Sequence, residues 1–135
     1  MVELQKKTKG DIAELAVAKK LMEDGWRVLI PYGENHRYDL VVEKDHKFVR
    51  IQVKYVTPRN NVLNINCRSS NNWSVLHYSP EEIDIISAYN PHDGEIYFIP
   101  ILEINRSLFK IRISPAKNNQ KLKIHLAKDF RKLKV

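Results

Sequence analysis

The segment from Tyr38 to Lys54 reads YDLVV at 38–42, EKDHK at 43–47 and FVRIQVK at 48–54, and it is the most informative part of the sequence for the fold. Two apolar runs separated by a short polar turn predict a β-hairpin. Because side chains alternate along a strand, Gln52 and Lys54 share one face. The hairpin would bring that face beside Asp39, at the start of the first run. This arrangement of an acid, an amide and a lysine indicates metal-dependent phosphodiester cleavage.

Oxygen ligands for a hard divalent cation are available on this hairpin. Mg²⁺ is typically held by one or two carboxylates together with waters and phosphate oxygens. Asp39 offers a carboxylate, Gln52 an amide oxygen and Val53 a backbone carbonyl. We therefore predict these three residues as metal ligands, although an acid in place of Gln52 would bind the ion more strongly. The alternatives are a surface acid that caps a strand and a solvent-facing glutamine.

Lys54 stands between Val53 and Tyr55 in an otherwise apolar strand. A desolvated lysine beside a metal and a phosphate can orient or deprotonate the attacking water, or stabilise the charge of the pentavalent phosphorus. The alternative is a lysine that protects an exposed strand edge from aggregation. The neighbouring Asp39 favours the catalytic interpretation.

A helix is expected at about 9–24, with Thr8 as its N-cap and Gly25 as its stop. Apolar residues recur there at helical spacing. Glu14 falls on this helix, where it would either approach the ion held by Asp39 as a second carboxylate or face solvent. The spacing supports both interpretations equally.

The chain carries a formal charge of +7, with 23 Lys and Arg residues, which favours an acidic partner and nucleic acid first. Basic residues gather near the start of the chain and in the segment Pro115–Val135. A polar loop before Asp39 and a second loop at 68–73 are placed to contact DNA. The predicted contacts are Lys6, Lys7, Lys9, Arg37, Tyr38 and Arg68. The alternative is ordinary solvated surface charge.

Further strands are expected at 26–30, 62–67, 83–89 and 95–101, with a hairpin turn at 90–94. The segment 68–73 is expected to be a loop, and 79–82 a single short helical turn. Alternation at 109–113 marks another strand-like segment. At 135 residues and 43% hydrophobic, the chain suits a single domain at 1–135. The order of elements predicts an α/β fold, a mixed central β-sheet with a long helix packed on it.

No apolar run is long enough to span a bilayer, and no signal segment opens the chain. We therefore expect an intracellular protein without a membrane partner. Cys67, the only cysteine, is expected to be a small strand residue. The sequence lacks zinc-ligand spacing, a catalytic triad, a phosphate-binding glycine loop and a dinucleotide fingerprint.

Three segments, 9–14 (KGDIAE), 38–42 (YDLVV) and 51–54 (IQVK), together resemble the PD-(D/E)XK nuclease superfamily. The resembling branch holds archaeal-type Holliday junction resolvases and a small group I intron homing endonuclease. The resemblance implies a restriction-endonuclease-like fold, a mixed sheet flanked by helices. It implies catalytic roles for Glu14, Asp39, Gln52 and Lys54. Two residues depart from the motif, since Tyr38 replaces its proline and Gln52 its acid, the latter as in the homing branch.

By this resemblance the protein is expected to be a Mg²⁺-dependent DNA endonuclease, with Mn²⁺ able to substitute. The first expectation is a Holliday junction resolvase that cuts four-way junctions in DNA recombination, because basic residues outnumber plausible base readers. It would act as a homodimer, with a tetramer as the alternative, in the cytoplasm or nucleoid or as a virus-encoded enzyme in a host cell. The alternatives are a sequence-specific homing endonuclease and a catalytically weak DNA-binding module of the same fold.

Overall fold

The computed structural model describes residues 3–70, 75–105, 107–114 and 124–134, with the side chains of 69–70 and 75–77 left out. The α-helix α1 spans Lys6–Glu23. The predicted cap at Thr8 is wrong, because the amide of Lys9 already donates to the carbonyl of Gln5 at 3.0 Å and Gln5 is the N-cap. Gly25 ends the helix with φ +91, a conformation that glycine adopts freely. No helix in the described ranges is long and apolar enough to cross a membrane.

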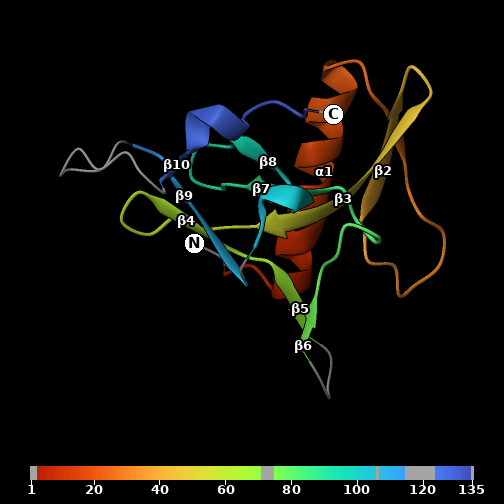
Figure 1. Ribbon diagram of the computed structural model, residues 1–135. Helices are drawn as coiled ribbons and strands as arrows, with labels where there is room; N and C mark the ends of the chain where they lie inside the picture. Colours follow the sequence, from red (N-terminus) through yellow and green to blue (C-terminus); the bar gives the residue numbers. More distant parts are fainter. Residues whose placement is uncertain (1–2, 71–74, 106, 115–123, 135) are drawn as a thin grey trace.

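A five-stranded mixed sheet forms the centre of the protein (Figure 1). Its strands, in spatial order, are β1 (Arg27–Leu29), β2 (Leu40–Lys44), β3 (Lys47–Tyr55), β7 (Ile85–Tyr89) and β8 (Ile96–Pro100). The β3–β7 pair is parallel and the other pairs are antiparallel. The predicted hairpins β2–β3 and β7–β8 are both present.

The helix α1 covers one face of this sheet. Ala13, Val17 and Leu21 are fully buried on α1 and pack in one cluster with Leu40 and Ile51 of the hairpin. Since Ile51 faces the helix, alternation places the next residue along the strand on the opposite face. The polar side chains of β3 at positions 50, 52 and 54 therefore point away from α1.

A second, three-stranded sheet covers part of that opposite face. Its order is β10 (His125–Leu126), β9 (Leu108–Arg112) and β4 (Val62–Asn66). Ile65 of β4 and Ile111 of β9 pack with Ile86 of β7 in a second core cluster, and all three are fully buried. The α/β fold class is confirmed, but in the described part of the chain this sheet, and not a second α-helix, forms the other layer.

Short elements complete the described structure. The 3₁₀ turns η1 (Ile101–Glu103) and η2 (Ala127–Phe130) follow β8 and β10. The predicted loop at 68–73 is wrong in part, because β5 (Arg68–Ser70) pairs with β6 (Val75–His77) in a hairpin seen at the bottom of Figure 1. Residues 71–73 of that loop, and residues 115–123 and 135 of the basic segment, lie outside the described residues. The segment at 79–82 forms a hydrogen-bonded turn.

Candidate active site

Asp39 immediately precedes β2 and bridges to β3. Its amide donates to the carbonyl of Ile51 at 2.8 Å, and its Oδ2 accepts from the amide of Val53 at 2.8 Å. The carboxylate thus takes the place of the next backbone acceptor before β2 begins. This bond fixes the half-buried side chain and leaves Oδ1 available to a ligand.

The backbone carbonyl of Val53 lies on the same side of β3. In a β-strand the N–H and C=O groups of one residue point toward the same neighbouring strand. The carbonyl of Val53 therefore points in the same direction as its amide, toward Asp39. Outside the strand ladders, no hydrogen bond between described residues reaches this carbonyl. Gln52 stands directly across from Asp39, one step beyond the Leu40–Ile51 pair. Three residues that bear candidate oxygen ligands are therefore neighbours where β2 begins.

Glu14 approaches Asp39 from α1. Both residues are half-buried, and both line a hollow of about 260 Å³ together with His36 and Tyr38. Burial raises the pKa of Glu14, and the negative charge of Asp39 raises it further. Burial also raises the pKa of Asp39, while the Val53 amide and the charge of Lys54 partly oppose this. Two carboxyls that disfavour ionisation side by side form a site that a cation would stabilise.

The described residues hold no group of three or more His, Cys, Asp and Glu side chains that could bind a metal. The oxygen donors here are two carboxylates, one amide and one backbone carbonyl. This set fits Mg²⁺, which is commonly held by one or two carboxylates with waters and phosphate oxygens completing the shell. It does not resemble a zinc site, which would need thiolate or imidazole ligands.

Lys54 projects from the sheet face that is turned away from α1. Its Nζ lies 3.2 Å from the phenol oxygen of Tyr78 and 3.5 Å from the carbonyl of Arg68, and it stands 5.0 Å from the centre of the Tyr78 ring. The Arg37 guanidinium lies 4.6 Å from the centre of the same ring, and its Nε is 2.9 Å from Glu82. Tyr78 thus holds two cations next to the candidate metal ligands.

Arg50, two residues before Gln52 on the same strand face, anchors the segment that carries Tyr78. Its guanidinium donates to the carbonyls of Pro80 and Glu81 at 3.0 and 2.6 Å and to both carboxylate oxygens of Asp84 at 3.0 Å. The hydrogen bonds from Arg50 lower the pKa of Asp84. Sequence reasoning missed Tyr78, Glu82 and this pair. The alternation of three polar residues at 50, 52 and 54 was the sequence signal that this face of the strand has polar partners.

The predicted DNA contacts fall into two groups. Lys6 and Lys7 are exposed in the first turn of α1, where Lys7 forms an ion pair with Asp11 at 3.1 Å. Lys9 lies 5.7 Å from the centre of the Tyr55 ring. The second group, near Lys54, is less available to phosphate, because Arg37 is bound to Glu82 and Tyr38 packs against the second core cluster. Arg68, at the start of β5, has an exposed side chain.

The fold and the paired carboxylate and lysine define a nuclease-type domain. A family model described as PD-(D/E)XK endonuclease matches residues 4–133, and the chain belongs to this family. Among solved structures, the bacterial homing endonuclease I-Ssp6803I is similar, with a TM-score of 0.74 and 24% sequence identity. The match covers 95% of this chain and 89% of that one. No curated protein matches the chain.

Proposed function

We propose that the protein is a Mg²⁺-dependent endodeoxyribonuclease, in which Mn²⁺ can substitute, and that it cuts duplex DNA at a defined sequence. The observation that carries the activity is the convergence of Asp39, Glu14 and Lys54. Asp39 lies close enough to interact electrostatically with both Glu14 and Lys54, and Asp39 and Glu14 line one hollow. The family membership supports nuclease chemistry on DNA.

The candidate metal ligands are Asp39, Glu14, the Gln52 amide and the Val53 carbonyl. When bound, Mg²⁺ would polarise a phosphate oxygen and lower the pKa of an attacking water. Asp39, fixed by the Val53 amide, keeps one carboxylate oxygen directed to this place. Lys54 then supplies a positive charge, held by Tyr78, that orients the water or stabilises the pentavalent phosphorus.

Two observations favour a linear duplex as the substrate. The similar solved structure is a homing endonuclease, and amide and basic side chains occupy the solvent face of β4 and β9, where base readers would be needed. A duplex has two strands to cut, so we propose a homodimer with one active site for each phosphodiester. The second candidate is the Holliday junction resolvase, which is favoured by the three lysines in the first turn of α1.

Cleavage in the presence of Mg²⁺ tests the activity. Wild type, Asp39→Asn and Asp45→Asn would be incubated with a pool of duplexes of randomised sequence and with a four-way junction. Asp45 is the matched control, because it is an exposed acid at the turn of the same hairpin. We expect cleavage by wild type and Asp45→Asn, and DNA binding without cleavage by Asp39→Asn. Full activity of Asp39→Asn would refute the metal site, and an inactive wild type would favour the weak DNA-binding module.

A further inference from the structure

The sheet formed by β4 and β9 comes from two parts of the chain that contain no carboxylate. None of the 16 acidic residues lies between His46 and Pro80 or between Ile104 and Lys128. The two segments are far apart in sequence, and β4 and β9 bring them together as an antiparallel pair. An ordinary solvent-exposed sheet face mixes charges of both signs, so a face without acids fits a polyanionic partner.

The two faces of this strand pair differ sharply. The inner face is the second core cluster, and the outer face is mostly polar, although it also carries Leu108, exposed beside Asn66, and the half-buried Val62. On the outer face Asn64 is paired with Lys110, and Val62 is paired with Arg112 one step along. Asn66 follows Asn64 on the same face. Asn64, Asn66 and Lys110 are exposed. The outer face is therefore a two-stranded ribbon that presents amide and cationic groups.

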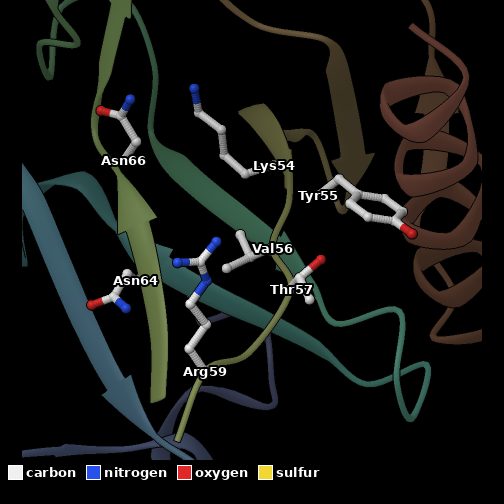
Figure 2. A pocket seen from close by; sticks show the side chains of 7 residues that line it. All are labelled: Lys54, Tyr55, Val56, Thr57, Arg59, Asn64 and Asn66. Carbon is white, nitrogen blue, oxygen red and sulfur yellow. The ribbon is translucent and has the colours of Figure 1, made fainter. Parts of the chain in front are cut away.

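This ribbon continues into the candidate active site. A hollow of about 410 Å³ lies between the end of β3 and β4, and Figure 2 shows Lys54 and Asn66 on opposite sides of it. Asn64 and Arg59 also line it. Tyr55 is turned the other way, toward α1 (Figure 2). DNA with a phosphate at Lys54 would thus pass next over the ribbon.

The side chains of the ribbon are available to bind a ligand. Within the described part of the chain, Asn64, Lys110 and Arg59 make no side-chain hydrogen bond or ion pair, in contrast to Arg50 and its fixed guanidinium. Asn66 uses its Oδ1 to accept from the amide of Arg68 at 2.9 Å, which leaves its NH₂ group to donate outward.

We propose that the outer face of β4 and β9 reads base edges in the major groove of duplex DNA, beside the phosphodiester that is cut. The proposal rests on the proposed function. The major groove admits a two-stranded β-ribbon, and asparagine pairs with adenine there while lysine and arginine pair with guanine. Asn64 and Lys110 are the central readers, since they lie opposite each other. Arg59 and Arg112 flank them and contact phosphate or guanine.

Binding can be measured apart from cleavage by using the full chain with Asp39→Asn. A pool of duplexes randomised over about two helical turns is selected on this protein to yield a preferred site. Asn64→Ala and Lys110→Ala are then added one at a time, with Lys47→Ala as the control. Lys47 is exposed at the turn of the β2–β3 hairpin, away from the ribbon. Each protein is titrated with the selected site and with random duplex at one fixed salt concentration.

We expect a clear preferred site, and a loss of about 10-fold in affinity for that site in each ribbon variant. The affinity of each ribbon variant for random duplex should stay within about twofold of the parent protein's, because a single exposed lysine contributes only one phosphate contact at most. Lys47→Ala should match the parent on both duplexes. A selection that yields no preferred site overturns the proposal. An equal loss of affinity for the selected site and for random duplex in the ribbon variants also overturns it. Failure of wild type to cleave the selected site would count against the nuclease function and leave the binding result standing.

Discussion

The Nζ of Lys54 lies 3.2 Å from the phenol oxygen of Tyr78, which packs against the core cluster on the sheet face away from α1. The ammonium can only donate, so the phenol oxygen accepts this hydrogen bond. On the same ring, the Arg37 guanidinium lies 4.6 Å from the centroid. Tyr78 therefore fixes the position of the candidate catalytic lysine while its ring neutralises part of the repulsion between two cations.

We predict that Tyr78→Phe lowers the single-turnover cleavage rate by roughly 10-fold, the range expected for a lost hydrogen bond to a charged group. The phenyl ring keeps the cation–π contact, so folding should be preserved. Lys54→Ala alone should cost roughly 10²-fold or more. Single-turnover rates of the two single variants and the double variant check this. If Tyr78→Phe slowed cleavage by the same factor in the Lys54→Ala protein as in the wild-type protein, Tyr78 would act independently of Lys54.

The contacts of Tyr78 could not be read from the sequence, whereas the hairpin that carries Asp39 and Lys54 could. The hairpin is local, and its period-2 pattern and polar turn are visible within 17 residues, 38–54. Tyr78 lies 24 residues from Lys54, and it reaches the site only because β7 pairs in parallel with β3. The strand β5 was missed because Arg68-Ser69-Ser70 has low β-propensity and depends on its partner β6.

The Arg50–Asp84 pair should matter for stability more than for chemistry. We predict that Arg50→Met lowers the free energy of unfolding by roughly 1–2 kcal/mol, a value reduced for the partial exposure of the pair. Because Arg50 lowers the pKa of Asp84, this contribution is present above the ordinary carboxyl pKa and is lost as the pH falls through the lowered value. Urea denaturation at several pH values measures it. Arg27→Met, at an exposed position on β1, is the control, and equal midpoints for the two variants would contradict the prediction.

The two candidate metal carboxylates should destabilise the metal-free protein. Burial raises the pKa of both Asp39 and Glu14, so the folded state binds these protons more tightly than the unfolded chain. At a pH above the raised pKa values, ionisation of the two carboxyls therefore opposes folding. The free energy of unfolding rises again as the pH falls through these pKa values. We predict that Asp39→Asn and Glu14→Gln raise Tm by a few degrees at about pH 7 in EDTA, with the gain shrinking toward about pH 4.

Thermal unfolding with and without Mg²⁺ completes this test. Wild type should gain stability from the ion, because a ligand that binds only the folded state shifts the equilibrium toward it. Asp39→Asn should gain little. An unchanged Tm for Asp39→Asn in EDTA, together with an undiminished response to Mg²⁺, would remove Asp39 from the metal site.

Gln52 is the position where the chain departs from the family motif, and we predict that Gln52→Glu lowers the Mg²⁺ concentration needed for half-maximal cleavage several-fold. A carboxylate opposite Asp39 would add a full negative charge near the ion, where a neutral amide now stands. Gln52→Ala, which removes the oxygen ligand, should raise the required concentration. A Mg²⁺ titration of the cleavage rate measures both, and an identical midpoint in all three proteins would show that residue 52 does not touch the ion.

Salt dependence distinguishes the two candidate substrates. If a dimer neutralises about six phosphates, affinity for random duplex should fall about 10³-fold between about 50 and 200 mM salt. Charge reversal at Lys121, Lys123 and Lys128 should weaken binding to every DNA similarly, since phosphate contacts carry no sequence information. The proposed base-reading face predicts that preference for one duplex sequence survives at high salt, because base contacts release no counterions. Titrations of a selected duplex, a random duplex and a four-way junction across the salt series measure this. A protein that prefers the junction at every salt concentration, whatever its sequence, would instead be the resolvase.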